Sequence, residues 1–263
     1  MTQLYNAIKI EAMLGIKSAF RYKVGIISDF LIFFTVYILA VFFGSGEGFL
    51  SSYDVNVSGV DGRILILIGV IFWQLSITAL GFSSNIIRNS YATGTLELRL
   101  QSKVSPIFLI FIDVMINLLT SLAILGIVLV ISYFYLDLFW NDVLKVLSSI
   151  LVVIPSVFGM FGIGLFLGGL TLKEKNIGQF IMIFQGILLF VSNSIIPISN
   201  KIINILPFPL GIDITRLMYL NQHVPLNYIS SYLLINSGWF ILGIIIFNIM
   251  LRAERVRGSF DTY

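Results

Sequence analysis

The chain has 263 residues, of which 58% are hydrophobic and only 11% are charged. A soluble domain carries about a quarter charged residues, so this composition excludes a soluble protein and predicts an all-α integral membrane protein. The formal net charge of +3 does not indicate a nucleic-acid partner, because the basic residues lie between apolar segments and form no basic face. The chain has no cysteine and one histidine, which excludes thiolate chemistry and multi-histidine metal sites.

Six apolar stretches are long enough to form helices that span about 30 Å of hydrocarbon. They run over Val24–Gly44, Ile64–Ile87, Ile107–Leu136, Val143–Leu172, Ile177–Pro197 and Tyr228–Leu251. The third and fourth are longer than a bilayer requires, so we expect them to tilt or to project from it. The segment Ile198–Asn227 contains prolines and only short apolar patches, which predicts a re-entrant or interfacial hairpin between helices five and six.

The distribution of Lys and Arg predicts the orientation, because cytoplasmic loops retain positive charge. With both termini inside, twelve of the sixteen basic residues are cytoplasmic and four remain outside: Arg63, Lys145, Lys201 and Arg216. We expect a multi-pass protein of the cell membrane with both termini cytoplasmic. Residues 1–263 are expected to form a single transmembrane domain, made of an amphipathic N-terminal helix (1–23), six membrane helices (24–251) and a cytoplasmic tail (252–263).

The segment Gln3–Phe20 places most of its apolar side chains in one helical sector, which predicts a helix lying in the membrane interface. An ordinary N-terminal helix packed against the spans is the alternative interpretation. A cleaved signal peptide is a weaker hypothesis, although the first apolar run ends at Gly44-Ser45-Gly46. More than twenty residues precede that run and its length is that of a span, so we expect it to stay attached.

The loop Arg88–Pro106 after the second span carries the most informative pattern in the chain. Gly94 suits a helix N-cap, Glu97 lies where the helix dipole favours a carboxylate, and Pro106 suits the first turn of the next span. We therefore expect a short helix outside the membrane. A docking surface would combine its apolar and basic side chains, Leu96, Leu98, Leu100, Arg99 and Lys103. A solvated connector is the alternative.

Gly94-Thr95-Leu96-Glu97, followed by Ser105-Pro106 at the head of the third span, resembles the G-T-L-E…S-P signature of the ABC-2-type permeases. These are the membrane subunits of one class of ABC exporter. The amphipathic N-terminal helix, the six spans, the proline-bearing hairpin and the basic tail Arg252–Phe260 also fit the layout of that family.

The resemblance implies how such a chain works and with what partners. Two permease subunits pair within the lipid of the membrane, and ABC ATPase subunits dock from the cytoplasm and carry the ATP and Mg²⁺. It assigns ATPase coupling to Gly94, Thr95, Leu96, Glu97, Leu98 and Arg99. The sequence itself contains no G-x-x-x-x-G-K-[ST] phosphate loop, so we expect no enzyme activity and no cofactor in this chain.

Several polar or small residues lie within the spans. Asp29 and Asp113 could serve ion coupling, but each lies only about 9 to 10 Å along its helix from the predicted cytoplasmic end, which favours structural or interfacial roles. A transport pathway and a simple helix break are equal interpretations of Ser192, Asn193, Ser194 and Pro197. The glycines of the fourth span predict close helix packing rather than a hinge: Gly159, Gly162, Gly164, Gly168 and Gly169.

Three classes of function remain. The first is the permease subunit of an ABC exporter, and the second is an ion-coupled secondary carrier that uses Asp29 or Asp113. An intramembrane enzyme is the third, and it lacks H-E-x-x-H, paired carboxylates and a nucleophile beside a base. The short outer loops and Phe-rich spans favour a hydrophobic or amphipathic cargo, such as a lipid, drug, peptide or glycan.

Overall fold

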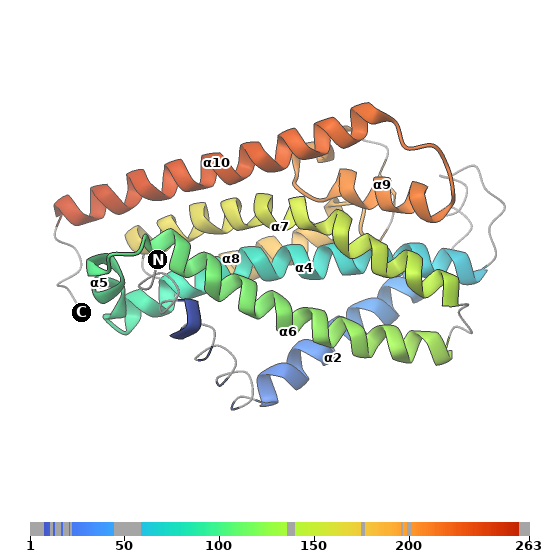
Figure 1. The fold of residues 1–263 in the computed structure, drawn as a ribbon, viewed down its shortest axis with the longest axis horizontal. Coiled ribbons are helices and arrows are strands. Elements are labelled where there is room, and N and C mark those ends of the chain that lie inside the picture. The colour runs from blue at the N-terminus through green and yellow to red at the C-terminus, as the bar shows by residue number, and fades with distance from the viewer. Residues whose placement is uncertain are drawn as a thin grey trace.

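The computed structural model describes residues 8–10, 13, 17, 21, 23–44, 59–135, 140–174, 177–195, 197–198 and 201–257. Figure 1 shows the helices as α2 (Lys23–Gly44), α4 (Gly59–Ala92), α5 (Thr95–Gln101), α6 (Pro106–Tyr135), α7 (Trp140–Glu174), α8 (Gly178–Val191), η1 (Lys201–Ile205), α9 (Pro209–Tyr219) and α10 (Leu226–Arg257). Five of them, α2, α4, α6, α7 and α10, are long and apolar enough to cross a membrane. The expected all-α membrane architecture is confirmed.

Three of the long helices, α4, α7 and α10, extend past the apolar stretches that predict them at both ends. α4 has 34 residues, which corresponds to about 51 Å at 1.5 Å per residue, against about 30 Å of hydrocarbon. α10 likewise continues through Arg257, so Arg252 and Arg255 lie on its last turns. Backbone hydrogen bonding carries a helix on into the interface, whereas a count of apolar residues detects only the part within the bilayer.

The fifth expected span, Ile177–Pro197, is a shorter helix than its apolar length suggests. α8 has 14 residues, about 21 Å, and the chain leaves the helix at Ser192. The expected hairpin between helices five and six then consists of η1 and α9, and α9 packs against α4, α7 and α10. We call the two ends of the bundle the α5 end and the α9 end, because Figure 1 places these helices at opposite ends.

Side chains of α10 satisfy the irregular backbone that precedes α9. The Trp239 indole donates to the Ile205 carbonyl at 2.8 Å, and the Asn236 amide donates to the Pro207 carbonyl at 2.9 Å. Without water in the hydrocarbon, such carbonyls need partners from the protein. The hairpin is therefore fastened to the last long helix.

α4 lies at the centre of the bundle. It packs against α2, α6, α7, α8 and α9, and its residues from Ile64 to Ile68 are fully buried. α2 and α10 lie at opposite edges of the bundle in Figure 1. A largely apolar helix suits the central position, because each of its faces meets another helix.

The glycines of α7 permit close approach on both of its sides, as the sequence predicts. A Cβ at Gly164 would overlap the Ser83 hydroxyl of α4, and a Cβ at Gly162 would overlap the Trp239 carbonyl of α10. Small residues let helix backbones approach and pack in a membrane, where the hydrophobic effect does not drive helix association. α7 is thus held between α4 and α10.

The Tyr232 side chain of α10 hydrogen-bonds to the α7 backbone beside the internal proline of α7. Pro155 lacks an N–H and crowds the preceding turn. The Tyr232 hydroxyl donates to the Val152 carbonyl at 2.7 Å and accepts from the Ser156 N–H at 3.2 Å, two groups that pair with each other in a regular helix. The hydroxyl therefore bridges the turn that contains the proline.

Replacing Gly243 of α10 by alanine is expected to destabilise the protein by about 1 to 3 kcal/mol, because the new methyl group would overlap the Gly162 backbone of α7. Gly238→Ala on the same helix is the matched control, since nothing lies within 4 Å of its added Cβ. Thermal unfolding of the purified variants in detergent measures the difference. Equal stability of the two would show that α7 and α10 pack less closely than the structure has them.

Two sequence expectations fall largely on residues outside the described part of the chain. Of the predicted amphipathic segment Gln3–Phe20, residues 8–10, 13 and 17 are described, and they are helical and exposed. Of the predicted tail 252–263, residues 252–257 belong to α10. For the remaining residues of both segments, the sequence prediction stands as a prediction.

Candidate functional site

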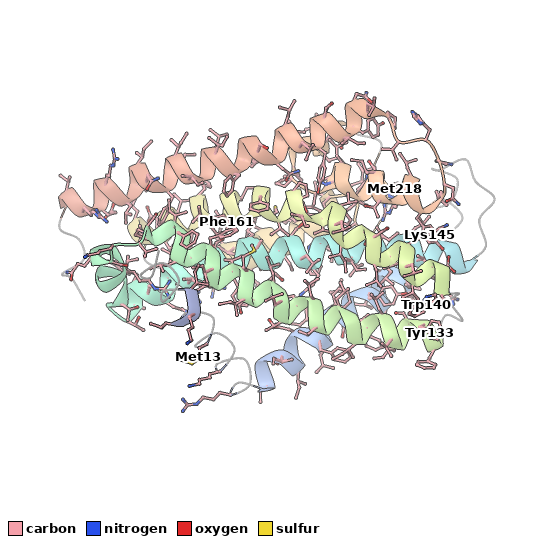
Figure 2. The ribbon with its side chains drawn as sticks, viewed as in Figure 1. Met13, Tyr133, Trp140, Lys145, Phe161 and Met218 are labelled. Atoms are coloured by element: carbon pink, nitrogen blue, oxygen red, sulfur yellow. The ribbon has the colours of Figure 1, made fainter. Side chains whose placement is uncertain are left out.

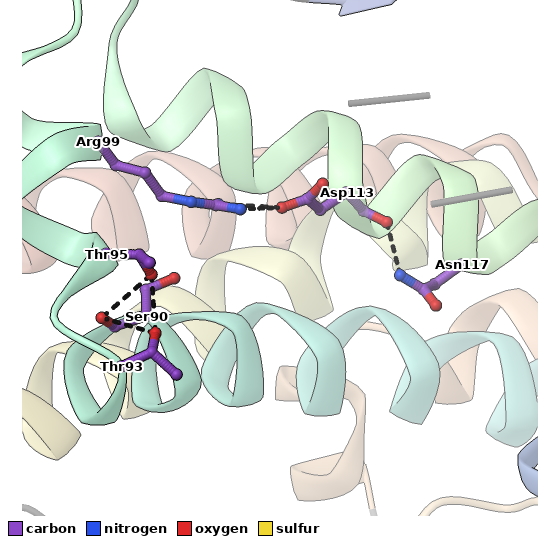
Figure 3. A network of polar contacts seen from close by, with 6 residues as sticks. All are labelled: Ser90, Thr93, Thr95, Arg99, Asp113 and Asn117. Atoms are coloured by element: carbon purple, nitrogen blue, oxygen red, sulfur yellow. Dashed lines mark hydrogen bonds and ion pairs between the residues drawn. The ribbon is translucent and has the colours of Figure 1, made fainter. Parts of the chain in front are cut away.

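The turn between α4 and α5 forms the predicted short helix where the sequence places it. Gly94 has a φ of 68°, a left-handed conformation that glycine adopts without steric cost, and it is the N-cap of α5. The Thr93 hydroxyl donates to the Asn89 carbonyl at 2.8 Å. The Thr95 hydroxyl donates to the Ser90 carbonyl at 3.3 Å (Figure 3). These bonds tie the start of α5 to the last turn of α4.

An ion pair ties α5 to α6. Figure 3 shows the Arg99 guanidinium reaching the Asp113 carboxylate, and its Nη1 and Nη2 atoms each lie 2.9 Å from Asp113 Oδ2. The two side chains are 22% and 15% exposed, so water screens the pair only in part. Asn117 donates to the Asp113 backbone carbonyl at 2.8 Å, one turn further along α6.

These contacts differ from the docking surface that the sequence predicts for this helix. Leu96 is buried, at 3% exposure, and belongs to the hydrophobic core, while Arg99 points to Asp113 rather than to solvent. The reason is the Thr93-Gly94 turn, which folds α5 back onto the bundle. Gly94 and Thr95 lie exposed at the turn, and the side chains of Glu97 and Leu98 lie outside the described residues.

Asp113 therefore has a structural partner, which agrees with the role that the sequence favours. Asp29 lies instead on α2, in the lining of a cavity of about 390 Å³ between α2, α4 and α8. Polar side chains line this cavity from all three helices: Asp29, Gln74, Thr78, Asn85 and Gln185. The Gln74 Oε1 atom is buried and accepts no hydrogen bond within the described part of the chain.

Sequence reasoning missed this cavity, although a signal exists in the second span. Gln74, Thr78 and Asn85, with Gly81 between them, follow one another at spacings of three or four residues and so lie on one face of α4. Gln185 of α8 lies opposite this face and makes two hydrogen bonds to α4, one through its backbone and one through its side chain. Its carbonyl accepts from the Trp73 indole at 3.1 Å, and its side-chain amide donates to the Ile77 carbonyl at 3.1 Å.

At the α9 end, the segment after α8 is a buried polar cluster rather than an open surface. Ser192, Asn193 and Ser194 are each at most 3% exposed. Asn193 has a φ of 66°, the left-handed conformation that ends helices and that asparagine tolerates better than most residues. Its side-chain amide donates to Asp213 at 2.8 Å, and its side-chain oxygen accepts from the Ile198 N–H.

A fully buried arginine from α9 completes this cluster. The Arg216 guanidinium donates to three backbone carbonyls, those of Leu65 at 3.0 Å, Asn193 at 2.9 Å and Ser194 at 2.9 Å. Gly69 of α4 makes the space, because a Cβ there would overlap the Ser194 carbonyl oxygen and lie 2.6 Å from Arg216 Nη2. Arg216 thus joins α4, α8 and α9.

The sequence leaves two interpretations open for four residues of this segment, and the structure gives three of them a different position from the fourth. Ser192, Asn193 and Ser194 break α8 and pack around Arg216, while Pro197 is half-buried beyond them. Sequence reasoning counted Arg216 as an outer-loop charge and missed its burial. The single histidine, His223, lies exposed in the connection between α9 and α10.

Comparison with known proteins gives one family. The model of the ABC-2 type transporter family matches residues 9–207, which covers α2 to α8 and the start of the hairpin. No curated protein sequence matches the chain.

Proposed function

The chain belongs to the ABC-2 type transporter family, and from that premise we propose that it is the membrane permease of an exporter driven by a separate ABC ATPase subunit. The observation that carries the proposal is the attachment of α5. A helix that is fastened to α4 by the threonine turn, to the hydrophobic core by Leu96 and to α6 by the Arg99–Asp113 pair can transmit force to the bundle.

The proposed mechanism is rigid-body coupling. The ATPase binds ATP and Mg²⁺ and carries out the hydrolysis, so this chain acts without catalysis and without a cofactor of its own. Closure of the ATPase displaces α5, and the contacts at Leu96 and Arg99 pass the displacement to α4 and α6. Gly94 and Thr95 supply the turn, and Glu97 and Leu98 belong to the same coupling helix.

We place the α5 end in the cytoplasm and the α9 end outside a cell membrane, with both termini cytoplasmic. The excess of Lys and Arg on the α5 side supports this orientation. A second permease subunit, of the same or a homologous chain, pairs with this one in the lipid, as the family resemblance implies.

The cavity between α2, α4 and α8 is our candidate for part of the cargo path. Its polar groups lie on otherwise apolar helices, which suits a hydrophobic or amphipathic cargo with a few hydrogen-bonding groups, whether lipid, drug, peptide or glycan. Ser192, Asn193 and Ser194 then act at the outer end as packing around Arg216 and not as a lining, with Pro197 just beyond them.

An ion-coupled carrier is the second candidate function, and the position of Asp29 in the cavity favours it. Intramembrane acids commonly serve ion coupling. Asp113 gives no support to that function, because Arg99 already holds it. Retained transport in Asp29→Asn would decide for the ATP-driven permease.

Site-directed labelling tests the proposed orientation and docking together, and the absence of native cysteine removes background reaction. Gln101→Cys at the end of α5 and His223→Cys at the α9 end both occupy exposed positions. A membrane-impermeant maleimide should label His223→Cys in intact cells and Gln101→Cys only in inverted vesicles. Adding the ATPase subunit to the vesicles should then protect Gln101→Cys.

The position at the opposite end serves as the control, because ATPase docked on α5 should leave the rate of His223→Cys labelling unchanged. Reaction of Gln101→Cys in intact cells would overturn the orientation. Undiminished reaction of Gln101→Cys with the ATPase bound would overturn the docking of the ATPase on α5.

A further inference from the structure

A second cavity lies on a part of the bundle that the proposed function does not use. It has a volume of about 520 Å³ and lies between α6 and α10, with α7 as its floor. Its floor and walls carry five phenylalanines: Phe108 and Phe111 of α6, Phe158 and Phe161 of α7, and Phe240 of α10. Figure 2 shows Phe161 in the space between α6 and α10. We call this cavity the phenylalanine groove.

Four of these rings form a connected set. Phe111 stacks on Phe158 at 5.8 Å and meets Phe161 edge-on at 5.5 Å, while Phe240 meets Phe158 edge-on at 5.6 Å and lies 6.2 Å from Phe161. Such contacts hold the rings in place. The groove is therefore a shaped apolar surface, and its length along α10, from Phe240 to Asn248, is about 12 Å.

The composition of the groove changes toward the α5 end. Ser105, just before α6, and Asn248 of α10 line that end of it. An exposed basic residue follows along α10, and another precedes α6. Lys103 lies two residues before Ser105, and Arg252 lies one turn beyond Asn248 on the same face of α10. The mouth of the groove is thus polar and flanked by positive charge on both sides.

Acidic groups near this mouth are engaged elsewhere. Asp113, two residues past Phe111, is held by Arg99. Glu254 of α10 is buried, at 5% exposure, and projects from a different face of the helix from Asn248 and Arg252. Lys103 and Arg252 thus make the exposed charge at the mouth positive within the described part of the chain.

We propose that the phenylalanine groove binds one anionic phospholipid of the leaflet at the α5 end. One acyl chain lies along the four rings, the ester region meets Ser105 and Asn248, and the phosphate lies between Lys103 and Arg252. Acyl chains gain little by moving from bulk lipid to an apolar protein surface, so the charged headgroup sets the preference. Two basic residues near the surface correspond to about a thirty-fold preference for anionic over zwitterionic lipid.

Native mass spectrometry of the purified full chain, released from micelles that contain equal amounts of phosphatidylglycerol and phosphatidylcholine, tests the proposal. The wild-type chain should retain one phosphatidylglycerol preferentially. The double variant Lys103→Gln/Arg252→Gln changes only exposed side chains, so it should fold normally and lose the preference. Arg252→Lys keeps the charge and should retain it.

Arg21→Gln is the matched control, because it removes an exposed positive charge ahead of α2, and Figure 1 places α2 at the edge of the bundle opposite α10. It should keep the wild-type preference. Ile244→Trp adds bulk within the groove and should reduce retention of the lipid while the charges remain. Equal retention of the two lipids by the wild-type chain, or an unchanged preference in the double variant, would overturn the proposal.

Discussion

Replacing Arg216 by methionine is expected to lower the stability of the folded protein by about 3 to 5 kcal/mol. Methionine is also unbranched along its stem but is shorter and donates no hydrogen bonds, so the carbonyls of Leu65, Asn193 and Ser194 lose their donors inside the protein. The measurement is thermal unfolding of the purified chain in detergent, together with the fraction that remains monodisperse.

Arg63→Met is the matched control for this prediction, since Arg63 is an exposed arginine on α4 at the same end of the bundle. Its replacement should change the stability by less than about 1 kcal/mol. Gly69→Ala on α4 should also destabilise the protein, because its methyl group would displace the Ser194 carbonyl and the Arg216 guanidinium. If Arg216→Met is as stable as Arg63→Met, the cluster does not hold the α9 end together.

The sequence predicts features that depend on local chemistry. Apolar stretches place the long helices, and the left-handed Gly94 and the first-turn Pro106 place the boundaries of α5 and α6. The close packing of α7 was predictable for the same reason, because glycine spacing on one helix shows where another backbone can approach.

Features that depend on distant contacts were missed. The extent of the fifth span was overestimated because Ser192, Asn193 and Ser194 lie among apolar residues, and only the backbone conformation of Asn193 shows that α8 has ended. The sequence predicts Arg216 to be a charged residue of an outer loop, because its partner Leu65 lies 151 residues away in the chain. The inward position of Leu96 depends on how the turn at Gly94 folds α5 against α4 and α6.

The charge on Asp113 is expected to matter as the partner of Arg99 and not as an ion site. Arg99→Asp and Asp113→Arg each place two like charges together at the joint between α5 and α6, where the wild-type pair makes two hydrogen bonds of 2.9 Å. Each single variant should lower ATP hydrolysis by the reconstituted complex, measured above the rate of the free ATPase, by about tenfold, the effect of about 1.4 kcal/mol.

The double variant Arg99→Asp/Asp113→Arg restores opposite charges in exchanged positions, and it should recover most of the stimulated hydrolysis. This recovery separates the two functions that the sequence leaves open. A carrier that binds an ion at Asp113 needs a carboxylate on α6, so the exchanged pair cannot rescue it. In the permease, α5 needs only an attractive contact with α6, whichever helix supplies the acid. A double variant that folds and still lacks stimulation would assign Asp113 a role of its own and remove the Arg99–Asp113 contact from the proposed coupling route.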